Sequence, residues 1–210
     1  MEDNISEIEP IPTREMTTQR LIITIVSIVL VVILAVASAL LVKKYVISTF
    51  IVDGISMYPT LDGGNGAVAE ISTEETRKNG EILYLNKVAK LKRGDIIVFA
   101  PEWPELVDSN GNYKSLVKRV IAVSGDHLQI LANKVYLNGE LLDEPYINEP
   151  MLYTPDIDIV VSENHIFCMG DNRNGSTDSR RSTIGMIDTR CILGKVVFRL
   201  WPLHSAGRLR

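Results

Sequence analysis

The sequence predicts a mainly β protein that begins with one transmembrane helix and continues as a β-rich domain. Three observations lead to this fold class. Residues 21–42 form an apolar run without a single charge. After residue 44, short segments rich in β-branched and aromatic residues recur every 10–20 residues, separated by turn-forming residues. Little of this second part has the periodicity of an amphipathic helix, so its strands are expected to pair with one another.

The apolar run has the length of a membrane-spanning helix. Its 22 residues extend about 33 Å at a rise of about 1.5 Å per residue, which matches a hydrocarbon core of about 30 Å. A cleaved secretory signal is an alternative, because residues 35–39 (AVASA) contain two overlapping small-x-small sites. The acidic N-terminal segment and the continuation of the run to Val42 favour an uncleaved anchor. Self-cleavage near Ala37 or Ala39 stays open.

The distribution of charge and proline divides the chain into three parts. Residues 1–20 are polar and contain two prolines, which predicts a disordered tail; residues 21–43 form the anchor, and residues 44–210 form the folded domain. Two basic residues flank the anchor on each side, so the positive-inside rule does not orient it. The chain has a formal net charge of −4 and no basic block, which argues against nucleic-acid binding.

The predicted strands of the domain are short and bounded by turns. They are residues 45–52, 67–71, 96–99, 115–123, 135–141, 166–169 and 191–200, of which the last is expected to close the sheet. The 135–141 segment has Asn138-Gly139 at its centre, the clearest hairpin signal in the chain. Residues 101–112, 145–159 and 170–180 are polar or rich in turn-forming residues and are expected to be loops.

The cysteines and histidines do not indicate a metal site. Cys168 and Cys191 are the only cysteines, and each lies in an apolar run, which favours two buried thiols with a disulfide as the alternative. Two cysteines and three scattered histidines are a poor ligand set for zinc. We therefore expect neither a metal nor an organic cofactor.

Three features of the domain point to chemistry, and the first is Ser56. It lies in residues 54–61 (GISMYPTL), between an apolar strand and a Pro-Thr-Leu turn. Pro59 lacks a backbone N–H and has a fixed φ, so the extended chain ends near it. Ser56 is thus expected at the exposed end of a strand, where a nucleophilic hydroxyl is held in place and can be reached. An ordinary turn serine fits the same octapeptide.

The second feature is Lys118, a lysine inside an otherwise apolar strand. The two-residue period of a strand places it on the same face as Leu116 and Val120. If that face is buried, desolvation lowers the pKa of the amine from about 10.4. A pKa near 7 requires that the charged form be destabilised relative to the neutral form by about 4–5 kcal/mol. A neutral amine can take the proton of a serine hydroxyl. The alternative is an edge-strand lysine whose ammonium reaches water.

The third feature is the polar segment 170–180 (GDNRNGSTDSR), which directly follows an apolar strand. Its aspartates and arginines are equal in number and spaced so that they can pair, and such a loop can hold the Ser176 hydroxyl beside a lysine. A solvated loop is the alternative. A Ser-His-Asp triad is disfavoured, because the chain lacks a G-x-S-x-G motif and His127, His165 and His204 lie in polar or terminal contexts.

Together these segments resemble the type I signal peptidases, membrane-anchored serine proteases that remove signal peptides from exported proteins. The chain is most similar to the short bacterial form with a single anchor. Four motifs match in order within residues 21–203, namely residues 56–61 (SMYPTL), 93–99 (RGDIIVF), 116–121 (LVKRVI) and 170–180. Eukaryotic-type relatives carry histidine at the position of Lys118, which favours the bacterial type.

The resemblance implies a role for each polar residue of these motifs. Ser56 would be the nucleophile, Lys118 the general base, and Ser176 the hydroxyl that orients the lysine amine. The supporting residues of the Ser176 loop would be Asp171, Arg173, Asp178 and Arg180. The oxyanion hole would use the backbone N–H of Ser56. Some family members add a hydroxyl two residues before the nucleophile, where this chain has Gly54.

The resemblance also implies how the domain is built and what it binds. It predicts two sheet regions, the second small and formed by about residues 126–165, with the N-terminal tail in the cytoplasm and the catalytic domain outside. The substrate would be a signal peptide with small side chains at positions −1 and −3. The residues expected to line its shallow apolar pockets are Val52, Met57, Leu61 and Val117. The peptide would pair as an added strand near Asp53 and Leu116.

Two other interpretations stay open. One is a specialised relative that processes pilin or transfer-apparatus proteins, and the other is a non-catalytic, membrane-anchored β domain that binds partners. The joint presence of Ser56, Lys118 and Ser176 argues against the second. The expected partners are signal peptides and membrane lipid, and Trp103 or Trp201 is expected to dip into the membrane interface.

Overall fold

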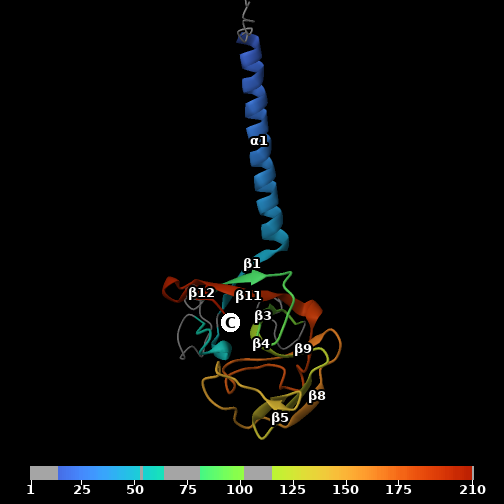
Figure 1. Cartoon of the computed structure of the whole chain (residues 1–210). Helices are drawn as coiled ribbons and strands as arrows, with labels where there is room; N and C mark the ends of the chain where they lie inside the picture. The colour runs from blue at the N-terminus through green and yellow to red at the C-terminus, as the bar shows by residue number, and fades with distance from the viewer. Residues whose placement is uncertain (1–13, 53, 64–80, 102–114, 210) are drawn as a thin grey trace, which may run out of the picture. The chain divides into compact units, whose positions relative to one another are not determined.

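The computed structural model describes residues 14–52, 54–63, 81–101 and 115–209, without the side chains of residues 14–17. The chain divides into two compact units, Met1–Tyr45 and Val46–Arg210. The first contains helix α1 and the second contains the sheets (Figure 1).

Helix α1 (Arg14–Tyr45) contains the whole apolar run. Its span Thr18–Tyr45 is long and apolar enough to cross a membrane, and among the described residues none of its most apolar stretch is buried. The hydroxyls of Thr24 and Ser27 donate to carbonyls one turn earlier, so these polar atoms are satisfied without water. A helix that is apolar on all sides requires apolar surroundings, which a bilayer supplies.

The large sheet of the second unit has eight strands in the order β1-β2-β11-β3-β4-β9-β10, with β12 paired to β11. All pairings among the described strands are antiparallel. The strands are β1 (Ile47–Val52), β2 (Glu81–Asn86), β3 (Ile96–Phe99), β4 (Leu116–Val123), β9 (His165–Met169), β10 (Ile187–Asp188), β11 (Ile192–Trp201) and β12 (Gly207–Arg208). The described residues also form the short 3-10 turns η1 (Ile55–Met57), η4 (Thr189–Cys191) and η5 (Leu203–Ser205).

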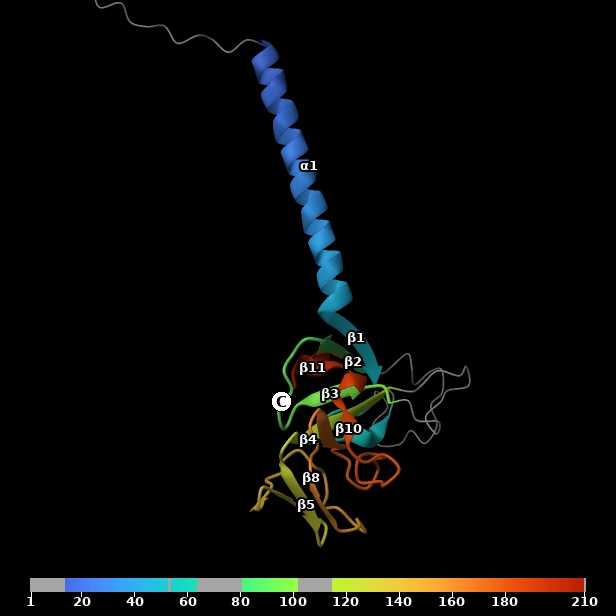
Figure 2. The ribbon, with the colours of Figure 1, turned by 90° about the vertical axis from the view of Figure 1, so that its right-hand side faces the viewer.

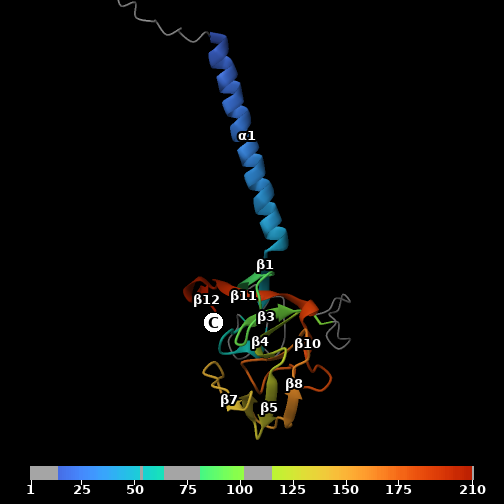
Figure 3. The same ribbon diagram turned by 45° about the vertical axis from the view of Figure 1, so that its right-hand side comes forward.

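The small sheet packs against the large one through a shared apolar core. Its four strands have the order β7-β6-β5-β8 and are β5 (His127–Leu131), β6 (Lys134–Leu137), β7 (Glu140–Leu141) and β8 (Ile157–Val160). Ile121 of β4 and Phe167 of β9 share a core cluster with Leu128 of β5 and Val135 of β6. Figures 2 and 3 show β4 between β3 and the small sheet. β4 is therefore buried along most of its length.

The predicted fold class, a mainly β chain with an N-terminal apolar helix and two sheet regions, is confirmed. The small sheet falls within the predicted residues 126–165. Asn138 and Gly139 join β6 to β7, and both have the positive φ that a type I′ hairpin turn requires, 55° and 87°. Cys168 and Cys191 are not joined by a disulfide; Cys168 is buried as expected, whereas Cys191 is only half-buried.

The structure differs from the expected strands in three respects. β2, β5, β10 and β12 are strands that the prediction omits, and burial alternates along β2 although its sequence is apolar at four consecutive positions. β8 (Ile157–Val160) begins inside residues 145–159, which the prediction treats as a loop. β11 lies between β2 and β3 instead of closing the sheet, because antiparallel pairing depends on contacts between distant segments rather than on chain order. The predicted strand 67–71 and residues 102–112 lie outside the described residues.

Candidate active site

Ser56 lies in the 3-10 turn η1, immediately after β1. The chain enters the turn in an extended conformation at Gly54, with φ 170° and ψ 155°. Met57 and Leu61, which follow Ser56 in the chain, are fully buried in one core cluster and so anchor the segment to the core. The half-buried Ser56 side chain is consequently held by a fixed backbone.

Lys118 lies in the middle of β4, with its amine against Ser56. Its Nζ is 2.7 Å from Ser56 Oγ and 2.9 Å from the carbonyl oxygen of Val117. The residue is only 2% exposed and β4 has a strand on each side, so the interpretation as an edge-strand lysine with a solvated ammonium is wrong. Burial lowers the pKa of Lys118 to about 8, although the nearby Asp178 carboxylate acts in the opposite direction.

Gly170 brings the polar loop into contact with the nucleophile. It follows β9, and a Cβ at this position would lie 2.3 Å from the carbonyl oxygen of Ser56 and 2.4 Å from Ser176 Oγ. Only a residue without a side chain allows this approach. The Ser56 carbonyl and the Ser176 hydroxyl thus lie close together, both against Gly170.

Ser176 lies beside this glycine, but its expected hydrogen bond to Lys118 is not formed. Among the described residues, Ser176 Oγ is buried without a hydrogen-bond partner of acceptable geometry. Its hydroxyl is near enough to Asp178 to help keep the pKa of that carboxyl low. Burial raises the pKa of Asp178, but the Arg180 guanidinium outweighs this effect, so the carboxylate is ionised.

Asp178 and Arg180 brace the loop from within. Arg180 Nε is 2.8 Å from Asp178 Oδ1, and Arg180 Nη2 donates to the Arg173 carbonyl at 2.6 Å. Asp178 also accepts from the backbone N–H of Gly170 at 2.9 Å. These contacts fix the backbone on both sides of Ser176.

Asp171 joins the loop to the strand of the lysine. Arg119 donates to it through two nitrogens, at 2.8 and 2.7 Å, and neither side chain of this ion pair is more than 2% exposed. The Thr60 hydroxyl donates to Asp171 Oδ2 at 2.5 Å. One buried carboxylate therefore connects the segments that carry Ser56, Lys118 and Ser176.

Arg173 joins the loop to the segment that precedes β8. It donates to Glu144 through two nitrogens, at 2.8 and 2.6 Å. The ring of Tyr146 lies 4.1 Å from the guanidinium carbon of Arg119 and 5.8 Å from that of Arg173. Burial raises the pKa of the Tyr146 hydroxyl, which donates to Glu144.

Sequence reasoning omitted Asn172, Arg119 and Tyr146 from the site. Asn172 donates through its backbone N–H to the Ser56 carbonyl at 3.1 Å and through its side chain to the Ile55 carbonyl at 3.2 Å. Asn172 and Arg119 lie inside two of the four motifs, and this location is the only feature of the sequence that could have indicated that they belong to the site. Their partners are distant in the chain and become visible only in the folded structure.

The residues expected to bind substrate fall into two groups. Val52, Met57, Leu61 and Val117 belong to one core cluster. Of these four, Val52 and Val117 are 5% and 6% exposed, whereas Met57 and Leu61 are 0% exposed. Leu116 is half-buried and packs against a different cluster. Asp53 lies outside the described residues.

Metal ligands and histidine do not form a competing centre in the described part of the chain. It contains no group of three or more His, Cys, Asp or Glu residues that could hold a metal ion. The described hydrogen bonds of His127 and His165 run to Asp158 and to the Glu163 carbonyl. The described side-chain partner of Ser56 is a lysine.

Comparison with known proteins agrees with this geometry. A family model described as signal peptidase, peptidase S26, matches residues 24–201. The chain is 30% identical over 184 residues to signal peptidase I S of Bacillus subtilis, covering 83% of this chain and 88% of that protein. It is 32% identical over 187 residues to signal peptidase I of Bacillus licheniformis, covering 83% and 87%. It is 34% identical over 177 residues to the probable signal peptidase I-1 of Synechocystis sp., covering 83% and 82%.

These matches extend over most of the chain and include the serine, the lysine and the loop that the structure brings together. The relatives are matched over more than four fifths of their own length. The chain therefore belongs to the signal peptidase family, peptidase S26, and is a serine endopeptidase of that family.

Proposed function

We propose that this chain removes signal peptides from exported preproteins, with Ser56 as the nucleophile and Lys118 as the general base. The observation that carries the proposal is the 2.7 Å contact between Ser56 Oγ and the amine of a lysine that is 2% exposed. Family membership supports the substrate class, since the relatives are signal peptidases by name.

Neutral Lys118 begins the reaction by accepting the Ser56 proton while Oγ attacks the carbonyl carbon of the scissile peptide bond. The tetrahedral intermediate collapses when the Lys118 ammonium gives its proton to the leaving amine, which frees the mature N-terminus. Water then attacks the acyl-enzyme as Lys118 again accepts a proton, and collapse releases the signal peptide carboxylate and restores the Ser56 hydroxyl. The lowered pKa of Lys118, about 8, keeps part of the enzyme in the neutral form at physiological pH.

The oxyanion formed in both attacks is stabilised by the backbone N–H of Ser56. Ser56 is the second residue of η1, and N–H groups in the first turn of a helix lack a partner within the helix. Gly54 contributes no side-chain donor, so the hole of this chain depends on backbone donors.

The signal peptide lies extended beside Ser56, as a strand added next to Leu116 and, outside the described residues, Asp53. The small side chains at positions −1 and −3 contact the exposed parts of Val52 and Val117. Met57 and Leu61 beneath them keep these pockets shallow and apolar, which selects small residues.

Helix α1 anchors the enzyme in the membrane, with residues 1–20 in the cytoplasm and the domain of residues 44–210 on the outer side. Anchoring confines enzyme and membrane-tethered substrate to the same surface and so raises their effective concentration. Exposed apolar side chains near the end of β11, among them Trp201 and Leu203 at 44% and 74% exposure, contact the lipid interface. Quenching of Trp201 fluorescence by brominated lipid tests this contact in a Trp103→Phe background, and an unquenched Trp201 contradicts it.

The decisive experiment is cleavage of a preprotein in detergent micelles by the wild type, Ser56→Ala and Lys118→Ala. Lys134→Ala serves as a matched control, because Lys134 is exposed on the small sheet. We expect the wild type and Lys134→Ala to cut after a small residue, and both active-site variants to be inactive although folded by circular dichroism. Near-normal activity of Lys118→Ala would remove the lysine from its role, and an inactive wild type would favour a non-catalytic binding domain.

A further inference from the structure

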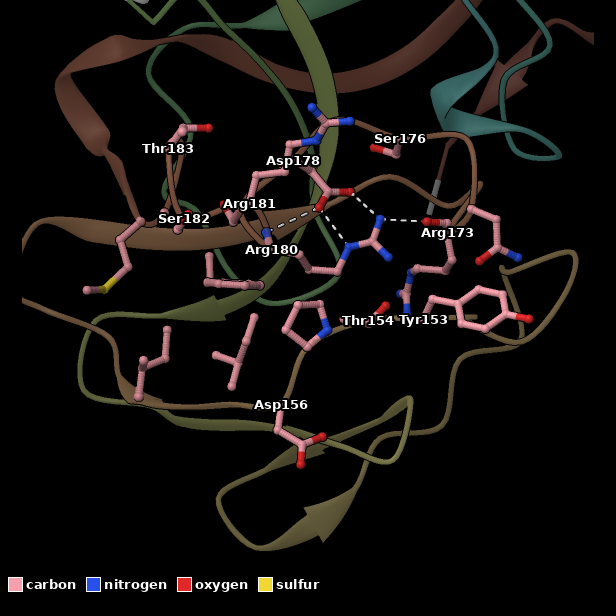
Figure 4. A pocket seen from close by; sticks show the side chains of 18 of the residues that line it. Tyr153, Thr154, Asp156, Arg173, Ser176, Asp178, Arg180, Arg181, Ser182 and Thr183 are labelled. Atoms are coloured by element: carbon pink, nitrogen blue, oxygen red, sulfur yellow. Dashed lines mark hydrogen bonds and ion pairs between the residues drawn. The ribbon is translucent and has the colours of Figure 1, made fainter.

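A large groove lies on the side of the Ser176 loop that the mechanism above does not use. Its volume is about 1010 Å³, which is at the upper end for ligand-binding pockets. One wall is formed by residues 173–186 and the other by residues 152–159, which include the beginning of β8. Figure 4 shows Ser176 and the Asp178–Arg180 pair on the first wall, opposite Thr154 and Asp156 on the second.

The groove reaches the catalytic centre through Ser176. This residue lines the groove, and its Oγ lies against Gly170, the glycine that also contacts the carbonyl oxygen of Ser56. Ser176 Oγ is also the one buried side-chain polar atom of the described residues that lacks a hydrogen-bond partner. A substrate polypeptide that extends from the scissile bond toward Ser176 can therefore enter the groove.

The walls suit an extended polypeptide. Ile157, Ile159, Phe167 and Met186 form an apolar lining. Ile157 and Ile159 alternate along β8 with the exposed Asp158 and Val160, so one side of the strand serves the groove and the other faces solvent. β8 is the last strand of the small sheet and pairs only with β5 among the described strands, which leaves backbone groups for an added strand.

The charges on the first wall favour an acidic side chain in the occupant. Arg173 and Arg180 are neutralised by Glu144 and Asp178. Arg181 also lines the groove and is exposed, and its side chain forms no hydrogen bond or ion pair with any described residue, although its backbone bonds to Asp178 and Ile184. The acidic Asp156 lies on the opposite wall, where it accepts from the backbone of Ala132.

We propose that this groove binds the segment of the preprotein that follows the cleavage site, extended along β8, with an apolar side chain in the lining and an acidic one at Arg181. The inference rests on the proposed function and deepens it, because it adds recognition of the mature protein to recognition of the signal peptide. The groove then contributes to which preproteins are cut efficiently.

The test compares two synthetic peptides with the same signal-side sequence. The long one continues for about ten residues beyond the cleavage site, enough to follow a strand of average length, and the short one ends as an amide after the first. Ile159→Trp fills the groove, and Val160→Trp places the same side chain on the opposite side of β8 as a matched control. We expect the wild type and Val160→Trp to cleave the long peptide with the higher kcat/KM, and Ile159→Trp to lose this preference while still cleaving the short peptide.

A second arm tests the charge and does not depend on changes to the core. In the long peptide, an aspartate near the third position after the cut is compared with a lysine. Arg181→Glu is expected to lower the ratio of kcat/KM for aspartate over lysine by about 2- to 5-fold or more, as an exposed charge pair does. Lys134→Glu, an equal change of charge away from the groove, is expected to leave the ratio unchanged.

The outcomes separate this inference from the proposed function. Cleavage of both peptides with an undiminished long-peptide preference in Ile159→Trp, or an unchanged charge ratio in Arg181→Glu, overturns the groove assignment alone. Failure of the wild type to cleave either peptide overturns the proposed function and the groove assignment with it.

Discussion

Lys118 lies where its amine can be neutral and still touch a hydroxyl. It is 2% exposed on a strand that lies between β3 and β9, and its Nζ reaches Ser56 Oγ and the Val117 carbonyl. The same desolvation that makes an ammonium unfavourable here makes the amine a base at moderate pH. The same local sequence on an exposed strand would leave the lysine amine in water, and its pKa would then be too high for it to act as a base.

The first prediction concerns the pH dependence of cleavage. Because neutral Lys118 is the active form and burial lowers its pKa to about 8, kcat/KM should increase as the pH rises through about 8 and then level off. The measurement is a pH–rate profile with a peptide that has no titrating group in this range. A rise of kcat/KM centred near about pH 6.5, the usual pKa of histidine, would contradict the assignment of Lys118 as the general base.

The second prediction concerns Gly54. Its backbone is extended and an added Cβ would meet nothing within 4 Å, so a serine fits without strain. A hydroxyl here adds a donor to the oxyanion hole, and we expect Gly54→Ser to raise kcat by at most about 10²-fold. Gly54→Ala adds the Cβ without the donor and should leave kcat unchanged. Equal kcat values for the two variants would show that the hydroxyl does not reach the oxyanion.

At the scale of elements, the site consists of one turn, one strand and one loop held together by backbone contacts. Asn172 donates to the carbonyls of Ile55 and Ser56, so η1 and the loop after β9 are joined directly. Gly170 lies inside this junction, where both the Ser56 carbonyl and the Ser176 hydroxyl occupy the space of a side chain. The alignment of the three elements therefore depends on the absence of one methyl group.

The third prediction follows from this contact. Gly170→Ala places a carbon 2.3–2.5 Å from Ser56 and Ser176, which requires η1 and the loop to separate. Because misplacement by about 1 Å can cost about 10²-fold, we expect kcat to fall by at least that factor. Gly207→Ala, at a glycine whose added Cβ meets nothing within 4 Å, is the control and should retain wild-type activity. A fully active Gly170→Ala enzyme would mean that the junction can open without harm.

At the scale of the whole folded domain, the two sheets and the site share one set of contacts. β4 and β9 contribute to the cores on both sides, and the chain between β7 and β8 contributes Glu144 and Tyr146 to the network around Arg119 and Arg173. Asp171 is the central acceptor of this network and is completely buried. Loss of its charge affects both the stability of the domain and the alignment of the catalytic residues.

The fourth prediction addresses that coupling. Asp171→Asn leaves the buried Arg119 guanidinium without its counter-ion, and breaking such a pair costs about 3–5 kcal/mol of unfolding free energy. Asp188→Asn removes the partner of Arg190, which is 88% exposed, and should have little effect. Urea unfolding of the two variants provides the comparison, together with their kcat values. Similar stability of both variants would show that the Arg119–Asp171 pair does not hold the domain together.

The sequence alone was enough to predict the apolar helix, the mainly β class and the Asn138-Gly139 hairpin, and it singled out Ser56, Lys118 and Ser176 as candidates whose roles came from the family resemblance. These features are local: a charge-free run, a turn dipeptide or a motif with its own spacing is complete within a few residues. The same reasoning omitted β2, β5, β10 and β12 and expected residues 191–200 to close the sheet, because pairing among antiparallel strands is decided by distant segments.

Only the tertiary structure decided that β4 is central and that Lys118 is buried beside Ser56. It also decided that Gly170 separates Ser56 from Ser176, that Asn172 and Arg119 belong to the site, and that a groove lies beyond Ser176. The physical reason is that burial, desolvation and close approach arise between segments remote in the chain. A sequence contains the groups that react, but the fold determines which of them lose their water and which come into contact.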